Sequence, residues 1–255
     1  LAAVSVGCSG SSHEVTPVPE MPSAEANHAT TPTPMITGPA PVSRRRRTVA
    51  RRDVARRQRD RRPRDHAGAD LVLHSATKFI DGQGRVLGGV VVGKKELIKE
   101  MYLFIRNTGP SMSPFNAWVL SKSLETLYVR MDRHADNALA LAKALQDHPQ
   151  ISRVKYPHLE SHPQYAVAQK QMSNGGGIVT FELKGGVESG RKFLDALQML
   201  SMTNNLGDSR SIASHPASTT HSKLSEAERL SVGITPGLIR ISVGLEHVDD
   251  IIRDI

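Results

Sequence analysis

The chain has 255 residues, of which 38% are hydrophobic and 4% aromatic, and its formal net charge is +8. It contains a single cysteine, which excludes an intrachain disulfide and argues against a cysteine-based metal site or thiol enzyme. No run of eighteen apolar residues occurs, so we expect no membrane-spanning helix and no membrane partner.

The average composition hides two unlike parts. All ten aromatic residues lie at or after Phe79. Residues 1–43 contain seven prolines and no lysine or arginine. Such a composition buries too little apolar surface to offset the entropy cost of ordering the chain. We therefore expect the first part of the chain, residues 1–66, to be disordered.

Residues 44–64 hold twelve arginines against two aspartates, so this arm carries +10 and the rest of the chain carries −2. An arginine run of this kind neutralises phosphates, which raises the hypothesis of nucleic-acid binding. No aromatic residue is interleaved for base stacking, and no zinc-finger or helix-turn-helix spacing accompanies the run. A solvated charge run is the favoured interpretation, and nucleic-acid binding is the remote alternative.

From Gly68 onward the pattern predicts a globular protein. Apolar runs between glycines predict strands at Leu71–Leu73, 88–93, Ile151–Tyr156, Ile178–Leu183 and Leu238–Val243. Helical spacing predicts helices at Lys94–Phe104, Pro114 to about His148, Pro163–Met172, Val187–Leu200 and from Val248.

The helix that begins at Pro114 has Ser113 as its cap, and its length suggests a spine that links two domains. We interpret its Trp118 and Met131 as core residues. After this helix the order of elements is βαβ-like, and it predicts a compact α+β domain.

The segment from His74 to Ile80 places two hydroxyls and one amine close together. Lys78 is the candidate nucleophile, and Ser75 and Thr77 are candidate ligands for an anion such as a cofactor phosphate. Phe79 and Ile80 are expected to end a strand that runs into a glycine-rich turn. The alternative is a solvated surface lysine, which a lone tetrapeptide of this kind favours.

A second group of polar residues lies in a long loop of the last domain. It begins at Asn205 and continues through residues 215–221. Long loops of this kind are more often functional than accidental. Arg240 follows in an otherwise apolar strand, where a guanidinium needs an anion. A substrate carboxylate and an internal salt bridge to Glu246 are equally compatible with the strand alone.

Six short motifs stand in order along the chain. They are Ser-Ala-Thr-Lys at 75–78, Gly-Gln-Gly-Arg-Val-Leu-Gly-Gly at 82–89, Ser-Leu-Glu-Thr-Leu at 123–127, Tyr-Pro at 156–157, His-Pro-Ala-Ser-Thr-Thr-His at 215–221 and Ile-Arg-Ile-Ser-Val-Gly-Leu-Glu at 239–246. The combination resembles the pyridoxal-phosphate enzymes of cysteine and methionine metabolism, the relatives of cystathionine γ-synthase. The resemblance covers about residues 67–255.

This resemblance implies an α/β, aminotransferase-like fold, with residues 67–135 as the remnant of a truncated large cofactor-binding domain and residues 136–255 as a C-terminal α+β domain. It implies pyridoxal 5'-phosphate as the cofactor and no metal. Lys78 would receive the cofactor aldehyde, and Ser75 and Thr77 would bind its phosphate. Arg240 and Asn205 would bind the substrate, with Arg240 on its α-carboxylate.

The sequence Asn-Leu-Gly-Asp at 205–208 resembles the homoserine-ester sulfhydrylases within the family. The implied reaction is γ-replacement on O-succinyl- or O-acetyl-L-homoserine by sulfide, which gives homocysteine in methionine biosynthesis. Cystathionine γ-synthase or γ-lyase activity is the alternative within the family. The resemblance also implies a cytoplasmic enzyme, and a homotetramer if the large domain is intact.

One part of the family pattern is not recognisable. Before Gly68 the family carries an aspartate for the pyridine nitrogen, an aromatic residue that stacks on the ring and further phosphate ligands. Residues 1–66 contain no aromatic residue, so they cannot stack on a ring. We hypothesise that this segment is read out of frame, and a non-catalytic truncated product is the corresponding alternative to an active enzyme.

Overall fold

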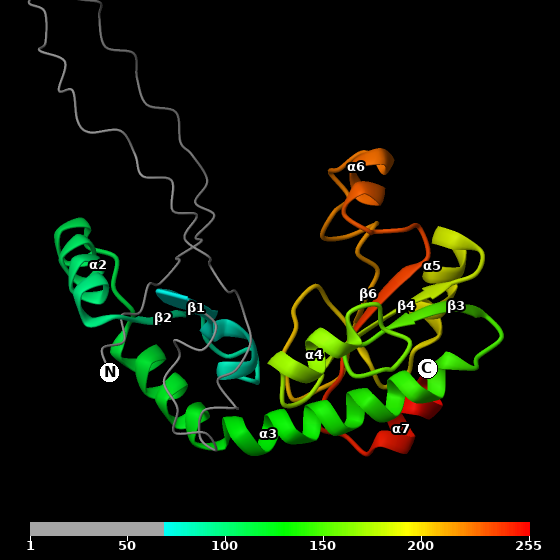
Figure 1. Ribbon diagram of the computed structural model, residues 1–255, viewed down its shortest axis with the longest axis horizontal. Helices are drawn as coiled ribbons and strands as arrows, with labels where there is room; N and C mark the ends of the chain where they lie inside the picture. Colours follow the sequence, from blue (N-terminus) through cyan, green and yellow to red (C-terminus); the bar gives the residue numbers. More distant parts are fainter. Residues whose placement is uncertain (1–68) are drawn as a thin grey trace, which may run out of the picture.

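The computed structural model describes residues 69–255 (Figure 1), and the predictions for residues 1–66 lie outside this range. The elements of the described range are, in chain order, β1 (Leu71–Ser75), η2 (Ala76–Ile80), β2 (Gly89–Gly93), α2 (Lys95–Thr108), α3 (Pro114–Gln146), β3 (Ile151–Lys155), α4 (Tyr165–Gln171), β4 (Ile178–Leu183), α5 (Gly186–Ala196), β5 (Ser201–Met202), β6 (Ile212–Ser214), α6 (Glu226–Ser231), β7 (Leu238–Ser242) and α7 (Val248–Asp254).

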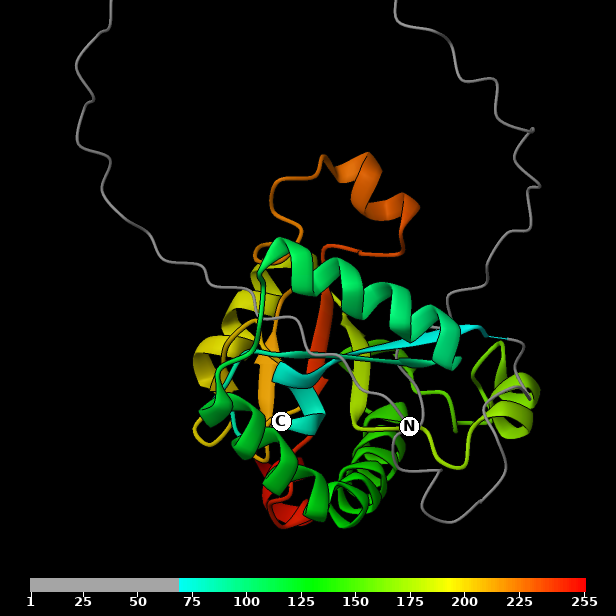
Figure 2. The same cartoon turned by 90° about the vertical axis from the view of Figure 1, so that its left-hand side faces the viewer.

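Two sheets are joined by one long helix. Strands β1 and β2 form an antiparallel hairpin, and the larger sheet has the order β3-β4-β7-β6-β5. Helix α3 runs along the lower side of the molecule from the hairpin to the larger sheet (Figure 1) and packs against η2, β3, β4 and α7. Helix α2 covers the hairpin (Figure 2), and its Ile98 packs on Val91 of β2.

Local signals explain where α3 begins. The hydroxyl of Ser113 accepts a hydrogen bond from the backbone N–H of Asn116 at 3.1 Å, and Pro114 occupies the first turn. A serine cap and an early proline both favour a helix start, because the first N–H groups have no partner within the helix. The predicted start of this helix is therefore confirmed.

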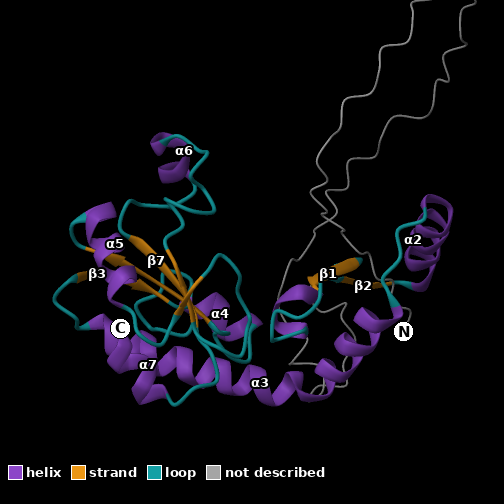
Figure 3. Ribbon diagram, turned by 180° about the vertical axis from the view of Figure 1, so that it is seen from behind, coloured by secondary structure: helices purple, strands orange, loops and turns teal. Residues whose placement is uncertain are grey.

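The main core lies between the larger sheet and helices α3 and α7, which run together beneath its strands (Figure 3). Alternate residues of β4 and β7 point into this core, namely Val179, Phe181, Ile239 and Ile241. The residues between them therefore face the other side of the sheet. Arg240 is one of these, opposite Thr180 on β4 and Ser214 on β6.

Several expectations about individual elements were wrong. Phe79 and Ile80 do not end a strand, since they belong to the short helical turn η2. The βαβ-like order does not give parallel neighbours, because β4 pairs antiparallel with both β3 and β7, and only β5 and β6 are parallel. Strands β5 and β6 and helix α6 were not predicted. They are short, so hydrophobic period gives little signal.

The expectation for Trp118 was also wrong, because its side chain is 59% exposed. Met131 is partly buried and packs against a cluster that includes Leu120 and Leu127. Helical spacing marks apolar positions along this helix. It does not show which of them the described chain covers, and Trp118 is left open.

Candidate active site

Lys78 lies in η2, directly after strand β1. Its backbone is not helical (φ −92°, ψ −129°), so the turn is interrupted at this residue. The turn is nevertheless closed by two backbone hydrogen bonds, from Asp81 N–H to the carbonyl of Ala76 at 2.9 Å and from Gly82 N–H to that of Lys78 at 2.8 Å. The lysine is therefore held in a defined, half-buried position.

The structure brings Lys78 to Asn205, which lies 127 residues later in the chain. The Lys78 amine donates a hydrogen bond to the Asn205 side-chain oxygen at 2.5 Å. A hydrogen bond to this side chain fixes the direction of the amine. The two polar groups that the sequence indicated separately thus form one site.

Close backbone packing holds the Asn205 loop against the lysine segment. Gly207 has a φ of +80°, and a Cβ at this position would lie 2.6 Å from the backbone nitrogen of Phe79. Ser209 N–H donates to the carbonyl of Gly82 at 2.7 Å. Only a glycine at 207 allows this approach, because it accepts the positive φ and leaves room for the neighbouring chain.

Asp208 stabilises the same loop from within. Its side chain is almost fully buried and accepts hydrogen bonds from the backbone N–H and the guanidinium of Arg210. Burial raises the pKa of Asp208, but the hydrogen bonds and the charge of Arg210 outweigh it and leave this pKa below its usual value. The carboxylate therefore stays ionised at neutral pH and keeps the loop closed.

Arg240 lies beside the same asparagine. Its Nη2 donates to the carbonyl of Asn204 at 3.0 Å and to that of Asn205 at 3.2 Å. Glu246, the alternative anion that the sequence offered for Arg240, accepts hydrogen bonds from the backbone N–H and the hydroxyl of Ser211. Asn205 therefore joins Lys78, through its side chain, to Arg240, through its backbone.

The two candidate phosphate ligands differ in their surroundings. The hydroxyl of Thr77 accepts a hydrogen bond from Gly88 N–H at 3.0 Å and approaches the Gly88 carbonyl at 3.4 Å. Ser75 is exposed, and its side chain makes no capping hydrogen bond to η2. The Ser75 hydroxyl is thus open to a ligand, whereas Thr77 holds the strand of Gly88 in place.

The polar residues of segment 215–221 form hydrogen bonds mainly within their own loop. His215 is buried, and its two ring nitrogens hydrogen bond to the Ser218 hydroxyl at 2.8 Å and to the Pro236 carbonyl at 2.7 Å. Both ring nitrogens of His215 therefore attach this loop to the residues that precede β7.

Two residues of α3 that sequence reasoning missed contact the lysine segment. Arg130 donates to the carbonyl of Phe79 at 2.7 Å, and the ring of His134 packs edge-on against the Phe79 ring at a centroid distance of 5.3 Å. Burial lowers the pKa of His134 to about 4. The available signal was an arginine and a histidine four residues apart on an otherwise apolar helical face.

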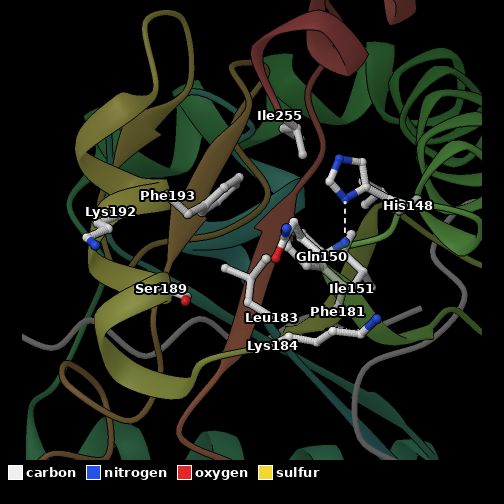
Figure 4. Close-up of a pocket in the computed structure, with 11 residues that line it drawn as sticks. His148, Gln150, Ile151, Phe181, Leu183, Lys184, Ser189, Lys192, Phe193 and Ile255 are labelled. Carbon is white, nitrogen blue, oxygen red and sulfur yellow. Dashed lines mark hydrogen bonds between the residues drawn. The ribbon is translucent and has the colours of Figure 1, made fainter.

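A groove at the far end of the larger sheet is a separate feature (Figure 4). It lies between α5 and strands β3 and β4, with Phe181, Leu183 and Phe193 among its lining residues and Lys184 and Lys192 at its rim. Lys78, Asn205 and Arg240 do not line it.

Within residues 69–255 no group of three or more His, Cys, Asp and Glu residues could hold a metal, and no helix in this range could cross a membrane.

The chain is similar to known proteins in sequence and in fold. The family model for the Cys/Met metabolism PLP-dependent enzymes matches residues 62–255. O-succinylhomoserine sulfhydrylase of Pseudomonas aeruginosa is 51% identical over 187 residues, which cover 73% of this chain and 46% of that protein. L-methionine gamma-lyase of Pseudomonas putida is 44% identical over 222 residues, which cover 86% of this chain and 56% of that protein.

The crystal structure of cystathionine gamma synthase from Xanthomonas oryzae pv. oryzae, in complex with aminoacrylate and cysteine, matches with a TM-score of 0.71 and 39% sequence identity. The match covers 73% of this chain and 49% of that one, so the chain spans about half the length of the relatives it matches. The fold is therefore the α/β, aminotransferase-like fold, represented in part. The chain belongs to the Cys/Met metabolism family of pyridoxal-phosphate-dependent enzymes.

Proposed function

We propose that the protein catalyses a γ-replacement on an acylated homoserine, O-succinyl- or O-acetyl-L-homoserine, in which sulfide displaces the acyloxy group and homocysteine is formed. The observation that carries this proposal is the hydrogen bond between Lys78 and Asn205 beside Arg240. The similarity to O-succinylhomoserine sulfhydrylase supports it.

The described residues fit the cofactor of the family. Lys78 offers an amine that is half-buried and directed by Asn205, which suits covalent attachment to an aldehyde. The exposed Ser75 hydroxyl lies three residues before it and is available to a phosphate, and Thr77 shapes the backbone between them. When bound, pyridoxal phosphate supplies an electron sink for the negative charge that develops at the substrate Cα.

The chain's own residues would orient the substrate and move its protons. The guanidinium of Arg240 would bind the α-carboxylate and hold the Cα near Lys78. The Lys78 amine, once free of the cofactor, would remove a proton from Cα and one from Cβ, which allows the γ-acyloxy group to leave as the carboxylate. After sulfide has added at Cγ, it would return protons to Cβ and Cα. Asn205 accepts a hydrogen bond from that amine, so it keeps the proton carrier aligned with the substrate.

An assay of the full chain with pyridoxal phosphate, sulfide and each of the two esters tests this proposal. We expect homocysteine to form, and we expect Lys78→Ala to abolish it. The matched control is Lys122→Ala, which removes an exposed lysine that pairs with Glu125 on the same helix. Equal activity of Lys78→Ala and Lys122→Ala would contradict the proposed role, and no activity in any variant would favour the non-catalytic alternative.

Elimination is the second candidate reaction, because L-methionine gamma-lyase is among the relatives. The same assay, run with and without sulfide, separates the two reactions. A replacement enzyme forms little α-keto acid and ammonia in the presence of sulfide, whereas a lyase forms both products whether or not sulfide is added. A homotetrameric assembly and a cytoplasmic location stay predictions from the family resemblance.

A further inference from the structure

Arg130 uses its guanidinium on the backbone that follows Lys78. Its Nη1 donates to the carbonyl of Phe79 at 2.7 Å, and its Nη2 donates to that of Ile80 at 3.1 Å. Nη2 also donates to the carbonyl of Ser123 at 2.9 Å, and Nε donates to the Thr126 hydroxyl. Arg130 is 9% exposed, so these bonds form away from water.

The two peptide groups that Arg130 binds need such a partner. They come at the end of η2, where the carbonyls have no N–H donor within the turn. The helical path is also interrupted at Lys78. Gly82 follows with a φ of +73°, and a Cβ at this position would lie 2.2 Å from Arg130 Nη1. A glycine at position 82 therefore leaves the room that the Arg130 guanidinium occupies.

The same face of α3 also holds the segment after Arg240. His134 lies four residues after Arg130, packs against Phe79 and hydrogen bonds through Nδ1 to the carbonyl of Val243 at 2.6 Å. Asn137 lies three residues further and donates to the carbonyls of Gly244 and Glu246 at 3.0 and 2.9 Å. Residues at these spacings lie on one helical face, so one rigid element contacts both halves of the site.

We propose that Arg130 is a positioning residue for the reaction: it fixes the peptide planes of Phe79 and Ile80, so that the Lys78 amine stays directed at Asn205 and at a constant distance from Arg240. This role rests on the function proposed for Lys78. A guanidinium suits it because its fork reaches two carbonyls at once, which the single ammonium of a lysine does not do.

Hydrogen exchange of the full chain tests the backbone part of this role. In Arg130→Met the amides of Asp81 and Gly82, which close η2, should exchange at least about tenfold faster, since the loss of one charged hydrogen bond corresponds to such a factor. The amides of β4 should not change. Arg133→Met is the matched control, because Arg133 is an exposed arginine on the same helix, and it should leave exchange at both sites unaltered.

Reductive labelling tests the positioning part. Each variant is treated with pyridoxal phosphate and borohydride, and the fraction of label on Lys78 is mapped against that on exposed Lys122. We expect this ratio to fall at least about tenfold in Arg130→Met, to recover little in Arg130→Lys and to be unchanged in Arg133→Met.

The outcomes separate the two proposals. If the unaltered chain labels Lys78 preferentially and Arg130→Met does so equally, the positioning role is overturned, even if hydrogen exchange shows a looser turn. If the unaltered chain shows no preference for Lys78, the proposed function fails and the positioning role fails with it. A loss of the preference in Arg130→Met and Arg130→Lys, with β4 protected, supports the role.

Discussion

Residue 207 decides whether the two halves of the site can meet. A side chain on Gly207 would collide with the backbone of Lys78 and Phe79, whereas a Cβ on Gly176 would meet nothing within 4 Å. Both glycines have a similar positive φ, +80° and +77°, so the conformational strain of an added Cβ is matched.

We therefore expect Gly207→Ala to lower the free energy of unfolding by about 1–3 kcal/mol more than Gly176→Ala does. Urea unfolding of both variants measures the difference. Reductive labelling should also show a weaker preference for Lys78 in Gly207→Ala alone. Equal destabilisation by the two substitutions would mean that the loop does not need this close approach.

His134 makes stability depend on pH. Burial is the largest of the effects that lower its pKa to about 4, from an ordinary value of 6.5. Between these values the unfolded chain binds a proton that the folded chain does not, so the free energy of unfolding falls as the pH falls through this window. The full effect is about 3 kcal/mol.

Urea unfolding at pH 7 and pH 4.5 tests this linkage. The unaltered chain should lose about 2–3 kcal/mol more between the two pH values than His134→Gln does. His148→Gln, at an exposed histidine after the same helix, should keep the pH dependence of the unaltered chain. An identical slope in His134→Gln and the unaltered chain would show that another group titrates.

At the scale of elements, one carboxylate attaches the last helix to the sheet. The side chain of Asp254 in α7 accepts hydrogen bonds from the backbone N–H groups of Gln198, Met199 and Leu200 at 2.8, 3.0 and 2.9 Å. Burial raises the pKa of Asp254, but these three bonds outweigh it and leave the pKa below its usual value.

Removal of this carboxylate should detach the turn that leads into β5. We expect Asp254→Ala to lower the free energy of unfolding by about 1.5–3 kcal/mol, since it breaks bonds to a charged group. Asp250→Ala removes an exposed carboxylate of the same helix that pairs with Arg253, and it should cost less than about 1 kcal/mol. Thermal or urea unfolding of the two variants should rank them in this order.

Elements with a local signal could be predicted from the sequence, and the others could not. Helix α3 and strands β2 and β4 lie where they were expected. Their signals are local ones: the cap at Ser113, the glycines beside β2 and the apolar run of β4. The break in η2 and the pairing of the strands depend on contacts with distant segments. Sequence periodicity contains no information on those contacts.

The site shows the same division. Lys78, Asn205 and Arg240 could be singled out because their residue types stand out from their surroundings, and Lys78 because its motif resembles a family. Their convergence could not be derived from spacing, since the lysine and the asparagine are 127 residues apart. Arg130 was missed because its position on an apolar helical face, four residues before His134, does not show which backbone carbonyls its guanidinium binds.

On the scale of the whole molecule, α3 connects the hairpin that carries Lys78 to the sheet that carries Arg240 (Figure 1). At its first turns and at the end of α2, large side chains stay exposed, among them Phe104, Phe115 and Trp118. Several large exposed apolar side chains in one region are typical of surfaces that another polypeptide covers.

The arginine arm, residues 44–64, is expected to act independently of the site. A solvated charge run is the favoured interpretation of this arm. If it binds nucleic acid, which is the remote alternative, its net +10 predicts that binding of generic duplex DNA by the full chain falls steeply between about 50 and 200 mM salt. Deletion of the arm should abolish that binding and leave labelling of Lys78 unchanged. Duplex binding that is indifferent to salt, or labelling that is lost with the arm, would contradict this independence.

The most direct measurement is the identity of the lysine that reacts with the cofactor. The full chain is incubated with pyridoxal phosphate, reduced with borohydride and digested, and the pyridoxyl group is located by mass spectrometry. We predict that the group is found predominantly on Lys78, in spite of its partial burial. A label distributed over exposed lysines such as Lys99 and Lys223, with Lys78 unmodified, would contradict the assignment of this site.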